Sequence, residues 1–212
     1  MHHEFTIGDL NHYLDLFDEL GLTVWIDGGW GVDALLGEQT RTHADLDIVI
    51  SASDAAVLRA TLFSRGFFDV PTGDHSDWNY VMGNADGKNI DFHVIEMAEG
   101  GRGIYGPPEH GVFFPAESLK ASGRIDGRHV RCLSAKFQVH SHTGYELKPK
   151  DFADIGALHR KFGIPLPPEY RDLLPDSLGP GCGARARCGG LRPHTQCRRR
   201  GGQHLGGLCQ PL

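Results

Sequence analysis

Three aspartates are the residues of this 212-residue chain whose type and spacing most directly indicate chemistry. Asp45 and Asp47 lie two residues apart in the alternating segment 45–51 (DLDIVIS), so on a strand both side chains point to one face. Two carboxylates held about 7 Å apart along a strand repel each other unless a cation lies between them. Hard oxygen ligands of this kind suit Mg²⁺, which takes its remaining ligands from water and from substrate phosphates.

Asp91 is the third acid and lies in a second alternating segment, 89–95 (NIDFHVI). If this strand pairs beside 45–51, three carboxylates converge on one patch, which can hold two ions on a triphosphate and assist in-line attack at phosphorus. The alternative is that each acid faces solvent at a strand end. A hydroxyl is a poor nucleophile at neutral pH, so Asp91 is also our candidate general base, with Glu96 or Asp33 as substitutes.

Two glycines and two loop residues extend the predicted site toward phosphate. Gly28 and Gly29 follow a predicted strand over 23–27 and precede a short helix, so their N–H groups can approach phosphate oxygens with no Cβ in the way. Arg41 and His43 lie in the next loop, where we expect them to contact a triphosphate. A solvent-facing position is the alternative for each.

The elements that must position these residues alternate between helices and strands. This order predicts an α/β (α+β) fold with a mixed sheet, followed by a smaller, mainly helical portion. Segment 100–108 is rich in glycine and proline and is predicted as a loop. Apolar periodicity predicts helices over 7–20, 31–36, 53–65, 116–121, 135–142 and 151–162, and strands over 23–27, 45–51, 78–82, 89–95 and 128–133.

Charge and composition change sharply at Pro175. Residues 175–212 hold nine glycines, six arginines and one acid, a net charge of +5, and predict a disordered tail without function. The first 174 residues then carry −11, which repels phosphate backbones and attracts cationic small molecules or metal ions, so nucleic acid is not an expected partner. No membrane-spanning segment or signal peptide is evident, so we expect a cytoplasmic protein without a membrane partner.

Two runs of sequence resemble a known family. GGWGVD (residues 28–33) followed by RTHADLD (41–47) is similar to the antibiotic-modifying branch of the DNA polymerase β-like nucleotidyltransferases. Within that branch, the similarity is to the lincosamide and aminoglycoside nucleotidyltransferases and covers roughly residues 5–170. The later segment 142–147 (HTGYEL), with Asp151 and Asp154 downstream, is more similar to the lincosamide enzymes.

The resemblance implies a polymerase β-like nucleotidyltransferase core over 1–97 and a C-terminal, substrate-covering portion over 98–174. It implies transfer of AMP from ATP, or from another NTP, to a hydroxyl of an antibiotic, with a lincosamide favoured and an aminoglycoside as the alternative. Apart from the resemblance, residues that could line an acceptor pocket are Tyr105, Trp78, His93, Glu96 and His142, with ordinary packing or a rim position as the alternative for each. The metal ligands implied are Asp45, Asp47 and Asp91 for Mg²⁺, with Gly28 and Gly29 at the phosphates.

Two other classes of function are compatible with the sequence. A transferase that modifies a protein or tRNA and a non-catalytic binding protein are the two remaining classes, although all three acids are present. The sequence also leaves open a homodimer.

Overall fold

Seven strands form one mixed sheet in the computed structural model, which describes residues 4–171. The main path runs β1-β2-β5-β4-β3, with β6 pairing to β5 and β7 to β6. β2 and β5 are parallel, whereas the other pairs of this sheet are antiparallel. The strands are β1 Val24–Ile26, β2 Leu46–Ser51, β3 Phe68–Val70, β4 Asn79–Gly83, β5 Asn89–Met97, β6 Gly103–Tyr105 and β7 Phe113–Phe114.

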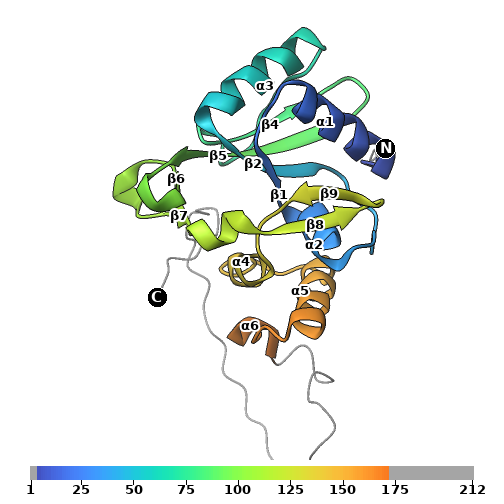
Figure 1. Cartoon of the computed structure of the whole chain (residues 1–212), viewed down its shortest axis with the longest axis vertical. Helices are drawn as coiled ribbons and strands as arrows, with labels where there is room; N and C mark the ends of the chain where they lie inside the picture. Colours follow the sequence, from blue (N-terminus) through green and yellow to red (C-terminus); the bar gives the residue numbers. More distant parts are fainter. Residues whose placement is uncertain (1–3, 172–212) are drawn as a thin grey trace, which may run out of the picture.

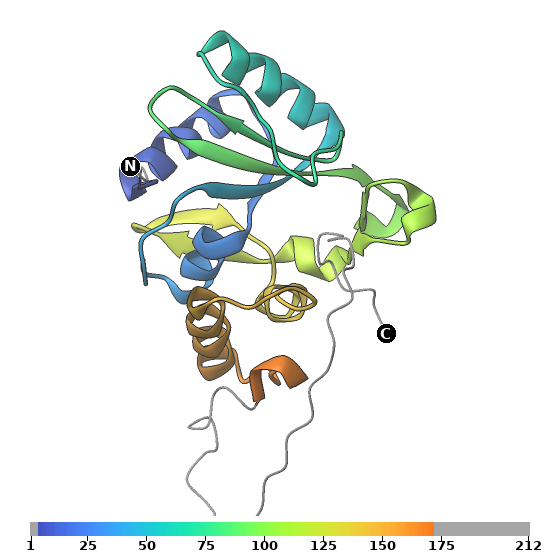
Figure 2. The same ribbon diagram turned by 180° about the vertical axis from the view of Figure 1, so that it is seen from behind.

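Helices lie on both sides of this sheet. In Figures 1 and 2, α1 and α3 lie above it, and α4, α5 and α6 lie below it. The α-helices are α1 Ile7–Glu19, α2 Gly28–Leu36, α3 Ala52–Ser64, α4 Ala135–Ser141, α5 Pro149–Phe162 and α6 Pro168–Arg171. Short 3₁₀ helices cover η1 Glu99–Gly101, η2 Pro108–His110 and η3 Ala116–Lys120.

The main hydrophobic core lies between the sheet and helices α1 and α3. Alternation along β2 points Leu46, Ile48 and Ile50 to this face, where all three are fully buried. They belong to one cluster with apolar residues of the two helices, such as Leu10 and Leu58. The remaining side chains of β2 therefore point to the opposite face of the sheet.

The N-terminal helix confirms its predicted start. Thr6 N donates to Asp9 Oδ2 at 2.7 Å, and Asp9 N donates to Thr6 Oγ1 at 3.2 Å, which is the reciprocal capping box. Helix α1 begins at Ile7 because these bonds satisfy N–H groups that the first helical turn leaves free.

Two predicted boundaries and one predicted loop are corrected by the structure. Helix α2 begins at Gly28, three residues earlier than predicted, because Asp27 caps it by accepting a hydrogen bond from Gly28 N at 2.7 Å. Strand β2 begins at Leu46, so Asp45 lies just outside it. The segment predicted as a loop over 100–108 contains strand β6.

Several short strands could not be read from periodicity. β3 and β6 have three residues each, too few to show an alternating pattern, and they exist because neighbouring strands supply their hydrogen bonds.

A second sheet pairs β8 Ser122–Ile125 with β9 Arg128–Arg131, of which only β9 was predicted. This hairpin lies directly on α2: a Cβ at Gly123 would lie 2.2 Å from the carbonyl oxygen of Ala34.

The two predicted portions meet within the larger sheet. β6 pairs with the end of β5, so strands from beyond residue 97 extend the sheet that carries Asp47 and Asp91. The mainly helical part begins at Ala135.

The tail predicted over 175–212 lies outside the described residues. Among residues 4–171, no helix combines the length and apolar character that a membrane crossing requires.

Candidate active site

Asp47 and Asp91 meet on the face of the sheet opposite the main core. They are direct register partners on the parallel strands β2 and β5, so their side chains leave adjacent strands at the same level and on the same side. The prediction that the strand of Asp91 pairs beside the strand of Asp47 is confirmed. The pairing brings together residues that are far apart in the sequence.

His93 joins the two carboxylates, whereas Asp45 does not reach this cluster. Ligand atoms of Asp47, Asp91 and His93 all lie within 4.8 Å of one another. His93 follows Asp91 by two residues on β5 and therefore shares its face. The sequence pattern predicted His93 only as a residue of the acceptor pocket, although its spacing of two residues from Asp91 indicates a position beside that acid. Asp45 precedes β2 and acts on both acids through its charge.

The electrostatics of this cluster favour a cation. Burial, together with the negative charges of Asp45, Asp91 and Asp27, raises the pKa of Asp47 well above its usual range, and the charge of Lys150 partly opposes this. Burial also raises the pKa of Asp91, with His93 opposing and Asp45 adding to the effect. Such acids lose their repulsion when a divalent cation binds between them.

The donor set fits a hard divalent ion such as Mg²⁺. The buried Oδ1 of Asp91 has no hydrogen-bond partner among the residues that the structure describes. A carboxylate oxygen held buried and unpaired is costly unless a proton or a cation satisfies it. Asp91 and Asp47 are carboxylates, the ligand type that Mg²⁺ prefers, and substrate phosphates commonly complete its shell.

His93 is oriented by a short polar chain. Tyr105 Oη donates to Asn79 Oδ1 at 2.8 Å, and His93 Nδ1 lies 3.3 Å from the same hydroxyl. Because the tyrosine has one proton, His93 Nδ1 must be the donor in the second contact. A neutral His93 then keeps its lone pair on Nε2. Burial raises the pKa of Tyr105, so the phenol stays protonated.

Gly28 lets the start of α2 lie against Asp47. Its φ is +54°, and a Cβ there would lie 2.1 Å from Asp47 Oδ2. No other residue type combines that backbone conformation with this close approach. The N-terminal turn of α2, with its outward N–H groups, is therefore in direct contact with the acidic cluster.

Gly29 has the same role toward Arg41 and His43. A Cβ on Gly29 would lie 2.3 Å from Arg41 Nη2 and 2.5 Å from His43 Nδ1. His43 is buried, and its Nε2 lies 2.6 Å from Asp33 Oδ2. Its Nδ1 lies 3.1 Å from Arg41 Nη1. His43 therefore packs behind the glycine turn and does not lie open in a loop.

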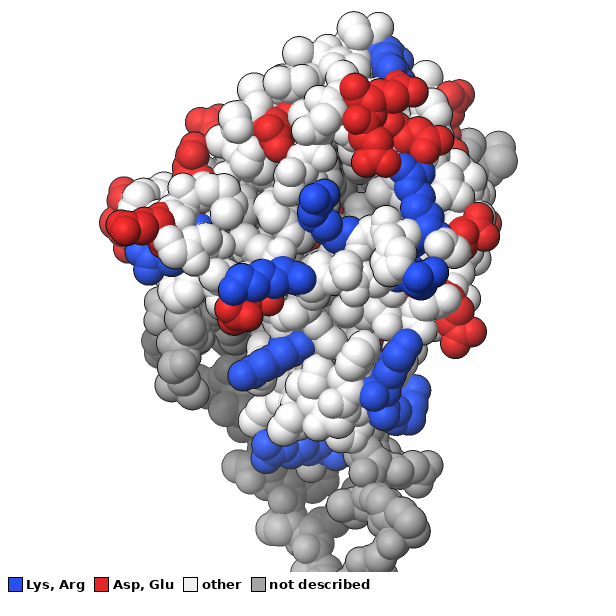
Figure 3. Space-filling view, in the orientation of Figure 1, with Lys and Arg blue, Asp and Glu red and all other residues white. Residues whose placement is uncertain are grey.

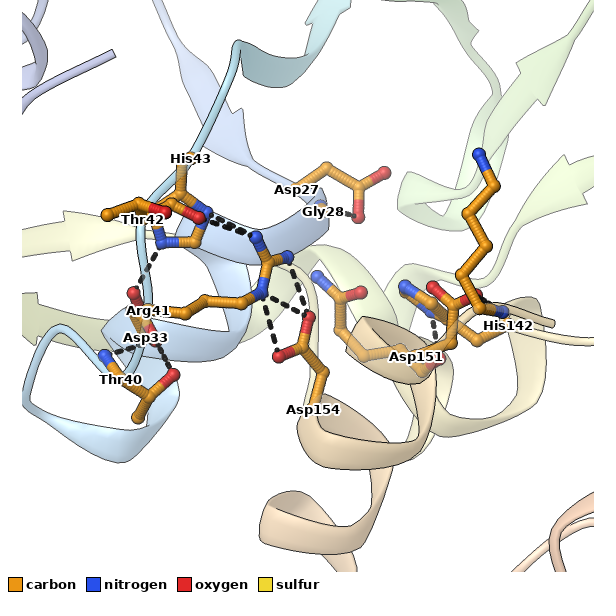
Figure 4. A network of polar contacts seen from close by, with 12 residues as sticks. Asp27, Gly28, Asp33, Thr40, Arg41, Thr42, His43, His142, Asp151 and Asp154 are labelled. Atoms are coloured by element: carbon orange, nitrogen blue, oxygen red, sulfur yellow. Dashed lines mark hydrogen bonds and ion pairs between the residues drawn. The ribbon is translucent and has the colours of Figure 1, made fainter. Parts of the chain in front are cut away.

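Arg41 forms an ion pair with Asp154 of α5, at 2.8 Å between Nη2 and Oδ2. Its Nε also lies 3.1 Å from both carboxylate oxygens of Asp154. Figure 4 shows Arg41 reaching from the loop before β2 to Asp154, with His43 and Asp33 on its other side. The chain Asp33–His43–Arg41–Asp154 thus joins α2, this loop and the C-terminal helices beside the glycine pair.

The other predicted pocket residues are divided between two places. Tyr105 lies with His93 near the acids, and Trp78 packs on Gly106, whose Cβ position is 2.9 Å from the indole. Glu96 is exposed at the end of β5. His142 lies on the helical side, where its Nδ1 is 2.7 Å from the carbonyl oxygen of Gln138.

Charge is unevenly spread over the surface. Figure 3 shows Lys and Arg side chains over the middle and lower part of the face seen in Figure 1, whereas Asp and Glu gather near its upper edge. The net charge of −6 therefore does not prevent one region from attracting an anion.

Comparison with known proteins agrees with this geometry. The model of the aminoglycoside-2''-adenylyltransferase family matches residues 9–158. A lincosamide resistance protein of Staphylococcus haemolyticus is 30% identical over 154 residues, which are 69% of this chain and 90% of the relative. A 2''-aminoglycoside nucleotidyltransferase of Escherichia coli is 44% identical over 137 residues, which are 64% of this chain and 72% of the relative.

Solved structures support the same assignment. The crystal structure of the lincosamide antibiotic adenylyltransferase LnuA, with lincomycin bound, superposes with a TM-score of 0.65 at 30% identity, over 74% of this chain and 98% of that one. The structure of ANT(2'')-Ia with adenylyl-2''-tobramycin has a TM-score of 0.55 at 23% identity, over 72% of this chain and 86% of that one, and supports the fold alone. The chain therefore belongs to the aminoglycoside-2''-adenylyltransferase family, a family of nucleotidyltransferases, as the runs at 28–33 and 41–47 indicated.

Proposed function

We propose that this protein transfers AMP from ATP to a hydroxyl of a lincosamide antibiotic in a Mg²⁺-dependent reaction. The observation that carries the chemistry is the register pair of Asp47 and Asp91 beside the first turn of α2. The lincosamide class is supported by the Staphylococcus haemolyticus relative, 90% of which is covered, and by the lincomycin-bound structure, 98% of which is covered.

Asp47 and Asp91 are the proposed direct Mg²⁺ ligands, and Asp45, which lies outside their cluster, is proposed to turn toward them when the ion binds. Bound Mg²⁺ neutralises phosphate charge and withdraws electrons from phosphorus. Asp91 is the proposed general base: it takes the proton of the acceptor hydroxyl, whose oxygen bonds to the α-phosphorus of ATP. The bond from that phosphorus to the bridging oxygen breaks on the opposite side, and pyrophosphate leaves with the bonding electrons.

Gly28 and Gly29 are proposed to hold the phosphates through backbone N–H groups at the start of α2. Arg41 remains a candidate for contact with the triphosphate, and His43 is proposed to act through Arg41 and the glycine turn. The bonds to Asp154, Thr42 O and His43 leave Arg41 one N–H, on Nη2, for that contact. The bond to Asp33 makes His43 a support for the turn. Lys150 is a further cation near the acids, because its charge affects the pKa of Asp47.

The portion over 98–174 is proposed to cover the antibiotic. Tyr105 from β6 already lies beside His93 on the core strands, and His142 belongs to the helical side. His93 of the core and residues of this second portion would therefore both contact the acceptor, with Asp91 between them and the nucleotide.

An aminoglycoside is the second candidate acceptor. The family model and the 44% identity with the Escherichia coli aminoglycoside enzyme favour it. The charge of −11 over the first 174 residues also suits a polycationic drug.

The two acceptors can be separated by pyrophosphate release. The purified protein is incubated with ATP and Mg²⁺ and with either lincomycin or a kanamycin-type aminoglycoside. We expect faster release with lincomycin. Faster release with the aminoglycoside would favour the second candidate, and release with neither drug would contradict both.

A further inference from the structure

We propose that the side-chain amide of Gln138, on α4, binds the terminal phosphates of the nucleotide by donating a hydrogen bond from Nε2. The proposal rests on the proposed function and adds a residue from the helical portion to the phosphate site. It assigns Gln138 a contact with ATP and with the pyrophosphate product, and none with the antibiotic.

The first observation is that Gln138 is fully buried and its amide is unsatisfied. Its exposed fraction is 0%, and neither Nε2 nor Oε1 has a hydrogen-bond partner among residues 4–171. A buried amide without partners lowers the stability of the folded chain, whereas an apolar side chain of similar shape avoids that cost. A buried amide without partners in the protein is explained if it hydrogen-bonds to a ligand when that ligand is bound.

The backbone of Gln138 is held firmly, so only the amide lacks partners. Its N–H donates to Ser134 O at 2.9 Å within α4, which Ser134 itself caps through Phe137 N. Its carbonyl oxygen accepts from His142 Nδ1 at 2.7 Å. The side chain therefore extends from a fixed helical position.

The second observation places this amide against the helix that carries the glycine pair. A Cβ on Gly31 would lie 2.6 Å from Gln138 Nε2, so the amide nitrogen touches α2 within its first four residues. Gly28, at the start of the same helix, contacts the carboxylate of Asp47. The amide thus lies about one helical turn from the proposed phosphate-binding N–H groups.

The chemistry of this location favours a phosphate that binds together with a divalent cation, because the acids beside Gly28 would repel a bare anion. α2 has nine residues, and its N-terminal end carries partial positive charge. Lys148 and Lys150 lie at the start of α5, and the charge of Lys150 acts on Asp47. Figure 4 shows Gly28 between Arg41 on one side and His142 and Asp151 of the helical portion on the other. An amide N–H in these surroundings is a suitable donor to a phosphate oxygen.

The test replaces the amide by an apolar group of similar shape. Gln138→Met is the main variant, Gln138→Leu is the second, and Lys136→Gln on the exposed side of α4 is the control. Binding of ATP, inorganic pyrophosphate and AMP is measured by calorimetry with Mg²⁺, and melting is measured without nucleotide. We expect 10- to 100-fold weaker binding of ATP and pyrophosphate by both Gln138 variants, with AMP binding unchanged.

Two further readouts separate binding from a structural role. Without nucleotide, Gln138→Met should melt at or above the wild-type temperature, because it removes an unsatisfied buried amide. The KM for ATP should rise while the KM for the antibiotic stays constant, and Lys136→Gln should match the wild type in every measurement.

The outcomes that overturn the proposal are distinct from failure of the proposed function. Wild-type affinity for ATP and pyrophosphate in both Gln138 variants would overturn it while leaving adenylyl transfer intact. Lower melting temperatures with unchanged nucleotide binding would make Gln138 structural. A wild-type protein that binds neither ATP nor pyrophosphate would contradict the proposed function, and this proposal with it.

Discussion

Asp47 and Asp91 are direct partners on parallel strands, so two carboxylates with raised pKa values leave adjacent strands at the same level. The arrangement is unfavourable for the protein alone and favourable once a divalent cation lies between the acids. The same two carboxylates therefore affect both the stability of the metal-free protein and the proposed Mg²⁺-dependent turnover. Melting temperatures and turnover rates of variants at these positions test both effects.

Asp47→Asn should abolish turnover and stabilise the metal-free protein. The variant removes a proposed Mg²⁺ ligand and also a half-buried charge beside other acids. The melting temperature at neutral pH should rise by roughly 2–4 °C for each kcal/mol of repulsion relieved. Added Mg²⁺ should stabilise the wild type and not the variant. Asp86→Asn, exposed in the turn between β4 and β5, is the control and should leave turnover and the Mg²⁺ response unchanged.

The stabilisation by Asp47→Asn should depend on pH. The pKa of Asp47 is raised in the folded state above its usual 3.8, so the folded protein holds this proton at a pH where the unfolded chain has lost it. The free energy of unfolding of the wild type therefore falls as pH rises through the folded-state pKa. The advantage of the variant should be largest at neutral pH and small at about pH 4. Melting curves without metal test this, and an advantage that grows toward acid would contradict it.

Asp91→Asn distinguishes two possible roles of Asp91, general base and metal ligand. Loss of a base alone should slow turnover by about 10²–10⁴-fold while the affinity for Mg²⁺–ATP changes little. Loss of a ligand should weaken Mg²⁺–ATP binding as well. Single-turnover rates and nucleotide titrations distinguish the two roles. Turnover at the wild-type rate would exclude both roles. Neither Glu96, exposed at the end of β5, nor Asp33, buried against His43, is placed to serve as the third acid instead.

Gly28→Ala should inactivate the enzyme, whereas Gly37→Ala should not. Both glycines have positive φ, +54° and +85°, so each substitution should cost about 1–2 kcal/mol of stability through backbone strain. A Cβ at Gly28 would also displace the carboxylate of Asp47, whereas a Cβ at Gly37 meets nothing within 4 Å. Denaturant unfolding and turnover are measured for both variants. Equal turnover in the two would contradict the proposed contact between α2 and the acids.

Arg41 and Asp154 should show strong energetic coupling. The carboxylate is 4% exposed and the guanidinium 24%, so removal of either partner leaves the other poorly satisfied. We expect Arg41→Gln and Asp154→Asn to be individually destabilising and their double variant to recover about 1–3 kcal/mol relative to additivity. If Arg41 also contacts the triphosphate, Arg41→Gln should raise the KM for ATP more than Asp154→Asn does. Additive effects on stability would mean that the pair is not coupled in solution.

The acidic pair was predictable because its signal is local. Alternation in 45–51 and 89–95 places Asp47 and Asp91 on strand faces, and GGWGVD marks the phosphate-binding turn. The same alternation contained His93, whose position two residues after Asp91 gives it the same face. The place of His93 in the cluster was not evident from the sequence, because a histidine between apolar residues is equally compatible with an ordinary pocket wall.

The contacts between portions could not be read from the sequence. Arg41 and Asp154 are 113 residues apart, and nothing local to either shows that α5 lies beside the loop before β2. The contact of Gln138 with Gly31 likewise depends on how α4 packs on α2. The early start of α2 follows from Asp27, whose side chain caps a helix that glycines disfavour by propensity.

The mass of the drug after incubation with ATP tests the proposed adenylyl transfer. Wild-type protein, Asp47→Asn and Asp86→Asn are each incubated with ATP, Mg²⁺ and lincomycin, and the reaction is repeated with a chelator in place of Mg²⁺. We expect a product heavier than lincomycin by one adenylyl group, formed by the wild type and Asp86→Asn and absent with Asp47→Asn or chelator. An adenylylated drug formed equally by Asp47→Asn, or formed without a divalent ion, would contradict this expectation.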